Sequence, residues 1–212
     1  MEKLEILPQV IFKFKCLDED LISNILLNLK QENWHSNLHT VRLNSSVQTI
    51  NNNLHKDVKY EKLFEWFHEC LNEVKNELNL NCELLEICLS WGNKSGYNCW
   101  HHQHTHSNSF ISGILYLTNS NSKTWFSIKN IWNMKSGNGY SPILVTPENL
   151  DLVVHKEDTI AANLIVFPSS LKHSVDEHKD ESSERYSISF NCFPSGRIVN
   201  AKELHTIEIN VL

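Results

Sequence analysis

Two segments in the first eighty residues have apolar positions at helical spacing. Residues 18–32 begin with the acidic run Asp18-Glu19-Asp20, which would lie at the positive end of a helix dipole. Residues 60–78 carry a continuous 3.6-residue stripe made of Leu63, Phe64, Phe67, Cys70, Leu71 and Val74. The pattern predicts two amphipathic helices, the second of which packs against a sheet. An alternating run within 5–15 predicts an early strand, and the Asn-rich residues 40–58 predict a loop with short extended pieces.

After residue 82 the pattern changes to short apolar or alternating runs, separated by Gly, Asn, Ser and Pro. Short runs with turn residues between them are typical of strands. The candidate strands are 83–91, 97–106, 110–118, 124–130, 151–154, 163–168, 172–176, 185–193 and 205–211. Their number and spacing favour a β-sandwich or barrel over a parallel α/β sheet. Residues 131–150, which contain two glycines and two prolines, predict an insertion loop.

Length, composition and charge fit one soluble globular domain. The chain of 212 residues is long enough to bury a sizeable core, and its hydrophobic (41%) and charged (21%) contents are ordinary. The net charge of −6 gives no basic surface for nucleic acid or an anionic membrane. No apolar run approaches the roughly 20 residues of a membrane span. We therefore expect neither nucleic acid nor membrane as a partner, and we leave a homodimer open.

Six cysteines are scattered along the chain, and no two of them form a C-x-x-C pair. The first fifteen residues lack the basic-then-apolar layout of a secretory signal. At this length and without such a signal, the cysteines are expected to be reduced and mostly buried. This predicts a cytoplasmic location.

Residues 98–106 contain a cluster of four histidines. Residues two apart on a strand point the same way, so His102, His104 and His106 are expected on one face and His101 on the other. Neutral imidazole is a good ligand for iron, zinc, copper or nickel. Taken alone, the cluster fits a metal site and a histidine-rich surface patch about equally well.

Two later positions favour the metal site. A single histidine, His173, follows an apolar strand and a short turn, and Arg185 and Ser187 share one strand face. A guanidinium can hold a carboxylate with two hydrogen bonds, and a neighbouring hydroxyl can add another. Alone, His173 also fits a core histidine, and Arg185 fits a strand arginine paired with Glu181 or Glu184. The combination predicts a metal ion together with an acidic co-substrate.

The sequence around these positions resembles a known family. The matching stretches are Ser90-Trp91-Gly92-Asn93, Gly96-Tyr97-Asn98, His104-Thr105-His106-Ser107-Asn108-Ser109, Ser112-Gly113-Ile114-Leu115-Tyr116-Leu117, Phe167-Pro168-Ser169-Ser170-Leu171-Lys172-His173 and Arg185-Tyr186-Ser187-Ile188-Ser189-Phe190-Asn191. Together they resemble a group of bacterial and phage 2-oxoglutarate/Fe(II) oxygenases that are distantly similar to prolyl hydroxylases. The resemblance spans approximately residues 85–195.

The resemblance implies a mainly β fold with flanking helices, built on a double-stranded β-helix (jelly roll, cupin-like) core. It implies a single domain over 1–212, with an N-terminal strand and supporting helices in 1–82 and a catalytic jelly-roll core in 83–212. The implied activity is Fe(II)- and 2-oxoglutarate-dependent hydroxylation of an unidentified small molecule or peptide, with release of succinate and CO2. The loop 131–150 is expected to act as a lid.

The resemblance also implies the site residues. Fe(II) would be held by His104, His106 and His173, while Arg185 would hold the far carboxylate of 2-oxoglutarate. The other positions implied to contact the co-substrate are Ser187, Tyr116, Asn98 and Asn191.

One position departs from the family pattern. The usual ligand set is two imidazoles and one carboxylate, but position 106 is histidine. Sites with three histidines occur in cupin-type thiol dioxygenases, which do not use 2-oxoglutarate. Two alternatives therefore stay open, namely a three-His dioxygenase of that kind and a non-catalytic jelly-roll binding protein. Formation of succinate from 2-oxoglutarate separates the first, and the effect of His173→Ala on metal affinity separates the second.

Overall fold

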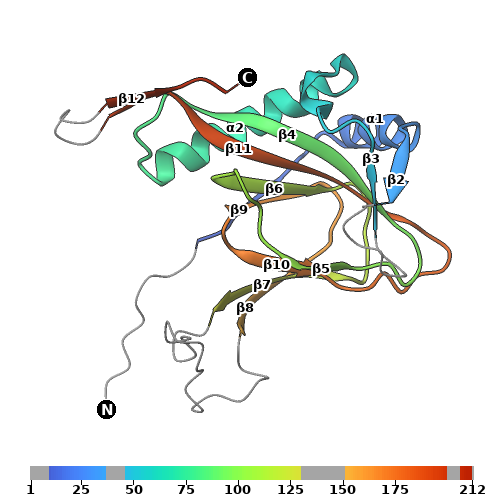
Figure 1. Cartoon of the computed structure of the whole chain (residues 1–212). Coiled ribbons are helices and arrows are strands. Elements are labelled where there is room, and N and C mark those ends of the chain that lie inside the picture. The colour runs from blue at the N-terminus through green and yellow to red at the C-terminus, as the bar shows by residue number, and fades with distance from the viewer. Residues whose placement is uncertain (1–9, 37–45, 130–150, 200–205, 212) are drawn as a thin grey trace, which may run out of the picture.

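The structure is a computed structural model that describes residues 10–36, 46–129, 151–199 and 206–211. Within these residues the chain forms two α-helices and twelve strands (Figure 1). In chain order they are β1 (Phe12–Lys15), α1 (Glu19–Lys30), β2 (Trp34–Ser36), β3 (Val47–Thr49), α2 (Glu61–Glu77), β4 (Leu84–Ser95), β5 (His101–His104), β6 (Ile111–Tyr116), β7 (Lys123–Lys129), β8 (Asp151–Asp158), β9 (Asn163–Pro168), β10 (Lys172–Val175), β11 (Arg185–Val199) and β12 (Thr206–Ile209). Two short 3-10 turns, Leu54–Lys56 and Val58–Tyr60, precede α2.

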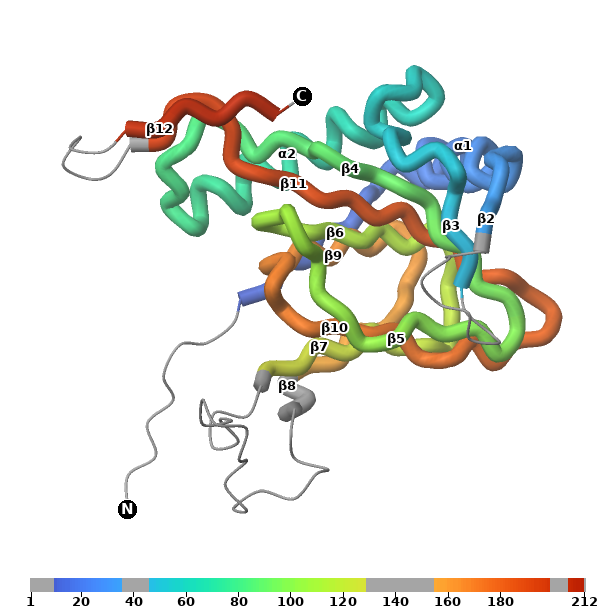
Figure 2. Tube along the Cα trace, in the orientation of Figure 1, coloured from blue at the N-terminus to red at the C-terminus, as the bar shows by residue number. Residues whose placement is uncertain are grey.

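The strands form two antiparallel sheets that face each other. The larger sheet has the order β1-β9-β6-β11-β4-β3-β2, with β12 paired to β11, and the smaller sheet has the order β5-β10-β7-β8. From β4 to β7 and again from β8 to β11, the chain crosses between the sheets at every step, and Figure 2 shows these crossings as a closed loop of chain. This alternation is the double-stranded β-helix that the resemblance implied.

Both helices cover the face of the larger sheet that points away from the smaller sheet (Figure 1). The side chain of Asp18 caps α1, because its Oδ1 accepts the backbone N–H of Leu21 at 2.8 Å. In α2, the fully buried ring of Phe67 packs on Phe190 of β11, with ring centroids 4.9 Å apart. The apolar stripe predicted for residues 60–78 is therefore the contact between helix and sheet.

A second, smaller core lies between the two sheets. It consists of Tyr116, Phe126, Ile165, Phe167 and Leu171. These side chains come from both sheets, and two of them, Tyr116 and Phe167, also line the cavity described below. The apolar core is thus continuous with the wall of the site.

Each candidate strand overlaps an observed one, but the predicted strand 97–106 needs correction. Strand β5 comprises only His101–His104; Asn98 lies in the turn before it and has a φ of 59°, a left-handed conformation that is incompatible with a strand. The sequence pattern also gave no signal for β2, which is three residues long. The predictions for residues 5–9, 40–45 and 130–150, including the proposed lid, lie outside the described residues.

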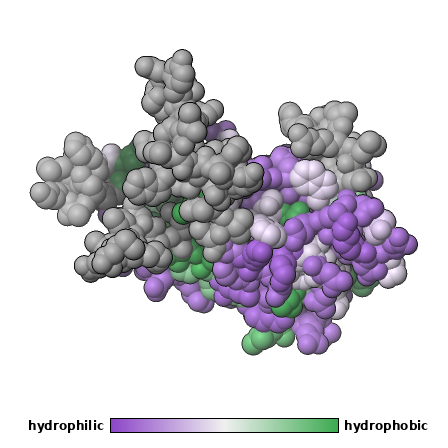
Figure 3. Space-filling model, turned by 90° about the horizontal axis from the view of Figure 1, so that it is seen from below, coloured by the Kyte–Doolittle hydropathy of each residue, from purple (hydrophilic) through white to green (hydrophobic). Residues whose placement is uncertain are grey.

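All six cysteines are free thiols, but only Cys16, Cys70 and Cys192 are buried, whereas most were expected to be. No helix in the described part of the chain is long and apolar enough to cross a membrane. Seen from the side of the smaller sheet (Figure 3), the described surface is mostly hydrophilic, with small and scattered hydrophobic areas.

The close approach of Gly113 and Phe190 in neighbouring strands yields a stability prediction. A Cβ at Gly113 would lie 2.2 Å from the ring atom Cζ of Phe190, which is fully buried. We expect Gly113→Ala to lower the free energy of unfolding by about 1–3 kcal/mol, because the ring has little room to move. Urea unfolding monitored by circular dichroism measures this change.

Gly96→Ala is the matched control, because a Cβ there would meet no atom within 4 Å. In a Phe190→Leu background, the cost of Gly113→Ala should shrink, since the smaller side chain leaves space. An equal cost in both backgrounds would contradict the proposed clash.

Candidate active site

A cavity of about 450 Å³ lies between the two sheets. Its walls come from β4, β6, β9 and β11 of the larger sheet and from β5, β7 and β10 of the smaller one, with residues of β2 and β3 at one edge. Among the described residues that line it, none is aspartate or glutamate, whereas five histidines of β5, its following segment and β10 contribute, together with Arg185. The described wall therefore combines apolar side chains with imidazoles and one guanidinium, and it contains no carboxylate side chain.

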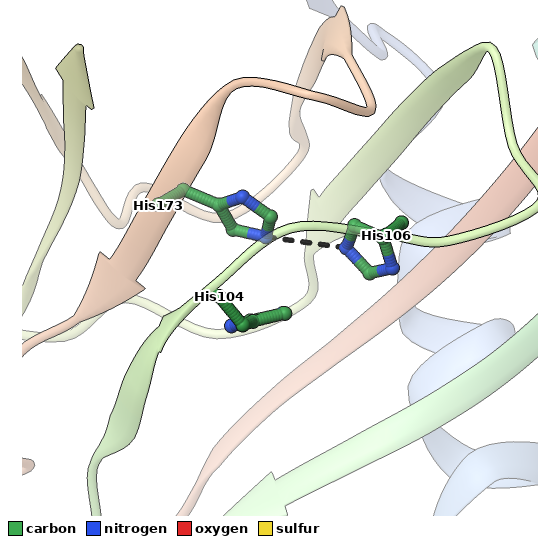
Figure 4. A group of neighbouring side chains, drawn as sticks. All are labelled: His104, His106 and His173. Carbon is green, nitrogen blue, oxygen red and sulfur yellow. Dashed lines mark hydrogen bonds between the residues drawn. The ribbon is translucent and has the colours of Figure 1, made fainter. Parts of the chain in front are cut away.

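Three of these histidines converge on one point (Figure 4). His104 ends β5, His106 lies in the following segment, and His173 is on β10, where it pairs directly with His104 across the two strands. The backbone N–H of His106 donates to the carbonyl oxygen of Ser169 at 3.0 Å, which ties its segment to the turn before β10. One ring nitrogen from each histidine lies within 4.8 Å of those of the other two. The three histidines that the sequence singled out therefore lie together in space.

Backbone carbonyls orient two of the rings. Nδ1 of His104 donates to the carbonyl oxygen of His102 at 2.8 Å, and Nδ1 of His173 donates to that of Leu171 at 3.0 Å. A carbonyl oxygen can only accept, so in the neutral imidazole each Nδ1 carries the proton and each Nε2 keeps its lone pair. This is the tautomer that a metal ion requires at Nε2.

Burial keeps these imidazoles neutral. Desolvation, reinforced by His104, lowers the pKa of His173 to about 2, and desolvation lowers the pKa of His106 to about 4. The pKa of His104 is also lowered by burial. Because a protonated imidazole cannot coordinate a metal, the three rings are in the binding form at neutral pH.

The donor set fits a divalent transition metal. Two ligand nitrogens on adjacent positions of one ion, each about 2.1 Å from it, lie about 3.0 Å apart, and Nε2 of His106 and Nε2 of His173 are 3.2 Å apart. Three neutral imidazoles suit iron, and equally zinc, copper or nickel. Geometry and chemistry therefore permit a shared ion at this point without selecting which metal it is.

Arg185, the first residue of β11, is buried in the same cavity with 4% of its surface exposed. Its Nη1 donates to the carbonyl oxygen of Asp176 at 3.0 Å and its Nη2 to Oγ of Ser95 at 3.0 Å. Neither acceptor is charged, and the guanidinium makes no ion pair with any described carboxylate. Of the two glutamates that could have paired with it, Glu184 lies 3.8 Å from Nζ of Lys94. A buried cation without a counter-ion is costly, so this site favours an anionic ligand.

The other predicted co-substrate positions divide into two groups. Ser187, Tyr116 and Asn191 line the cavity. Tyr116 is fully buried, and its hydroxyl is hydrogen-bonded to that of Thr124 on β7. Asn98, in contrast, lies outside the cavity in a turn, where its backbone N–H donates to His178. Of the two roles considered for Asn98, a turn residue and a co-substrate contact, the structure favours the turn residue.

The predicted orientation of His101 is wrong. Strand alternation predicts that it points away from the other histidines, yet it lines the cavity. The pairing of β5 with β10 contains an irregularity, in which His104 opposes His173 and His101 opposes Val175, so three steps on β5 match two on β10. Burial, His104, His102 and Arg185, in that order of effect, lower the pKa of His101 to about 3.

Asn93 on β4, which was not among the predicted site residues, lines the cavity and links Trp91 to β11. Its Oδ1 accepts from Nε1 of Trp91 at 3.1 Å, and its Nδ2 donates to Oγ of Ser189 at 3.0 Å. The ring of Trp91 lies beside His106, with centroids 5.8 Å apart. Trp91 and Asn93 share one strand face in the stretch Ser90–Asn93, and that parity was the available signal.

Comparison with known proteins supports the resemblance. Residues 89–191 match the family model described as "Putative 2OG-Fe(II) oxygenase". No curated protein sequence matches the chain. The matched range contains the three converging histidines, Arg185 and the strands from the second half of β4 to the first part of β11.

Solved structures of low sequence identity share the fold. A prolyl-4-hydroxylase from Pseudomonas putida is 13% identical, with 87% of this chain and 94% of that chain covered and a TM-score of 0.58. HygX from Streptomyces hygroscopicus, solved with nickel and 2-oxoglutarate, is 9% identical, with 96% and 92% covered and a TM-score of 0.60. SnoN, a non-haem α-ketoglutarate-dependent epimerase from nogalamycin biosynthesis, is 9% identical, with 90% and 81% covered and a TM-score of 0.64. The predicted fold is confirmed.

The convergence of the histidines predicts how metal affinity responds to mutation. We expect His173→Ala to weaken binding of Fe(II) or Ni(II) by at least about 100-fold, because it removes one of three ligands. Isothermal titration calorimetry of the metal-free protein measures the affinity. His155→Ala, which alters an exposed histidine of β8, is the control and should bind like the wild type. Equal affinity in both variants would favour a surface patch that binds metal adventitiously.

The lowered pKa values predict acid sensitivity of the metal-free protein. In the unfolded chain histidine titrates near 6.5, so below this pH the unfolded state binds protons that buried His173 and His106 do not. The contribution of these histidines to the free energy of unfolding is therefore fully present above about pH 6.5. As the pH decreases towards 4, the free energy of unfolding falls by about 1.4 kcal/mol per pH unit for each such histidine. Urea unfolding between pH 7.5 and 4.5 tests this. The variant His173→Leu should show a shallower dependence, and an unchanged slope would refute the assignment.

Proposed function

We propose that this chain, whose residues 89–191 belong to the 2OG-Fe(II) oxygenase family, is an Fe(II)- and 2-oxoglutarate-dependent dioxygenase that hydroxylates a small molecule or a peptide. Fe(II) would be held by His104, His106 and His173, and 2-oxoglutarate by Arg185 with Tyr116 and Ser187. The observation that carries the proposal is the buried guanidinium of Arg185, which has no described counter-ion and shares one cavity with the three histidines.

The position of Arg185 suits a dianionic co-substrate. Its guanidinium is tied through Asp176 to the end of β10, whereas His173 is near the beginning of that strand. From His173 to Asp176 is three residues, which span about 10 Å on a strand, on the order of the length of a five-carbon diacid together with its bonds to a metal and to a guanidinium. One end of such a diacid could reach the metal while its far carboxylate meets the guanidinium. A dioxygenase that does not use 2-oxoglutarate has no need of a buried cation at this point.

When bound, Fe(II) and 2-oxoglutarate supply the oxidative chemistry: one oxygen atom of O2 enters succinate, the other enters the substrate C–H bond, and CO2 is released. The chain supplies binding and shape. The carbonyl oxygens that accept from Nδ1 of His104 and His173 fix the ring orientations. Asp176 and Ser95 hold the guanidinium of Arg185 in place before the co-substrate arrives. Phe167 and Ile114 give the cavity an apolar wall that limits access of water.

Histidine at position 106 changes the charge of the site. With three neutral imidazoles, Fe(II) and the 2-oxoglutarate dianion together carry no net charge, one negative charge fewer than with a carboxylate ligand. His106 is also the observation that favours a second candidate, a three-His dioxygenase that does not use 2-oxoglutarate. The uncompensated charge of Arg185 makes this the weaker candidate.

Several expectations from the sequence remain part of this proposal. They are the division into a supporting region (1–82) and a catalytic core (83–212), and a cytoplasmic location, with which the six free thiols are compatible. The neighbouring structures include a prolyl hydroxylase with a peptide fragment, and HygX with hygromycin B. Both substrate classes are therefore retained here.

The proposal predicts succinate production that depends on Arg185. Fe(II)-loaded protein in air should convert 2-oxoglutarate to succinate, slowly even without its substrate, as measured by mass spectrometry. Arg185→Lys keeps the charge but loses the planar fork, so KM for 2-oxoglutarate should rise by roughly tenfold or more. Arg185→Gln should raise it further. Metal content, measured in parallel, should stay unchanged. No succinate with any candidate substrate would favour the three-His dioxygenase that does not use 2-oxoglutarate.

A further inference from the structure

The imidazole of His101 lies in the cavity without a hydrogen-bond partner in the described part of the chain. Its ring contacts other rings, those of His104 and His102, with centroids 5.0 and 5.9 Å away. By comparison, the rings of His104, His173 and His178 all have a nitrogen bonded to a backbone carbonyl. A half-buried imidazole that lines a cavity and keeps both nitrogens free is placed to meet a ligand.

The strand registers show which end of the cavity His101 faces. In the smaller sheet, Phe126, His173 and His104 form one row across three strands, and Thr124, Val175 and His101 form the next. The second row is displaced by two residues along β10, towards the carbonyl of Asp176 that accepts from Arg185.

The second row also adjoins Tyr116, whose hydroxyl is bonded to that of Thr124. His101 therefore lies at the Arg185 end of the cavity, beyond the point where the three histidines converge.

A carboxylate bound to Arg185 could accept a hydrogen bond from a further donor. A guanidinium has five N–H groups, and one from each terminal nitrogen is already given to Asp176 and Ser95. A carboxylate offers about four lone-pair sites, more than the remaining fork can fill in one plane. An imidazole presents an N–H donor in either neutral tautomer.

We propose that His101 is a co-substrate-binding residue, whose ring N–H donates to the far carboxylate of 2-oxoglutarate beside Arg185 and Tyr116. This inference rests on the proposed function. The irregularity in β5 then has a functional role, because regular alternation would turn His101 away from the cavity. The other role open to His101 is mechanical support of His104 through ring contact, and that role predicts a loss of metal affinity instead.

The test compares two ligands that differ only at the far end. The Ni(II)-loaded protein is titrated with 2-oxoglutarate and with 2-oxovalerate, in which a methyl group replaces the far carboxylate. In the wild type, 2-oxoglutarate should bind more tightly. His101→Phe keeps a ring but removes the donor, and it should weaken 2-oxoglutarate by about tenfold, the value of one hydrogen bond to a charged group, while leaving 2-oxovalerate unchanged.

Two further variants complete the design. His101→Gln restores a donor and should recover part of the affinity for 2-oxoglutarate. His155→Phe, at an exposed histidine, is the matched control and should bind both ligands like the wild type. The Ni(II) content and affinity of each variant are measured first, so that a loss at the metal is recognised.

The outcomes distinguish failure of the proposed function from failure of the role proposed for His101. If the wild type binds neither ligand, or does not prefer 2-oxoglutarate, the proposed function itself fails. If the wild type prefers 2-oxoglutarate and His101→Phe keeps that preference, the function stands and the role of His101 is overturned. Equal weakening of both ligands, or loss of nickel, would assign His101 to the support of His104 instead.

Discussion

The pairing of β5 with β10 is the constraint on which the site depends. It places His104 directly opposite His173 on a neighbouring strand, although 69 positions separate them in the chain. A slip of one residue would turn one of the two rings to the other face of the sheet, since side chains alternate along a strand. The same pairing also contains the irregularity that brings His101 into the cavity. The proposed metal site and the proposed co-substrate end thus correspond to two rows of one small sheet.

Desolvation gives this arrangement its chemical character. The core between the sheets and the helices behind the larger sheet enclose the cavity, so the histidines remain neutral and the guanidinium of Arg185 remains charged among neutral acceptors. An imidazole in its neutral form is a metal ligand, and a buried cation without a counter-ion is a binding site for an anion. Burial therefore gives these side chains the charge states that the two proposed sites require, one for a metal and one for a carboxylate.

The sequence predicted much of the fold and part of the site. The stripe of α2 and the strand around His173 follow from local periodicity, because one face of each element is buried. The convergence of His104, His106 and His173 was predicted through resemblance and spacing, and the structure brings the three rings together. The placement of Asn98 was not predictable in this way, because Asn98 lies in a left-handed turn before β5, where the pattern predicts that the strand has already begun.

By itself, the sequence determined the kinds of groups available: a histidine cluster, a distant histidine, an arginine at the start of a strand, and the periodicities of two helices and many short strands. Only the tertiary structure decided that the guanidinium of Arg185 has neutral acceptors instead of a glutamate partner, and that His101 faces the cavity. The physical reason is that strand register, bulges and burial arise from contacts between residues far apart in the chain. Local patterns of polar and apolar residues specify the face of an element, but they do not specify its neighbours.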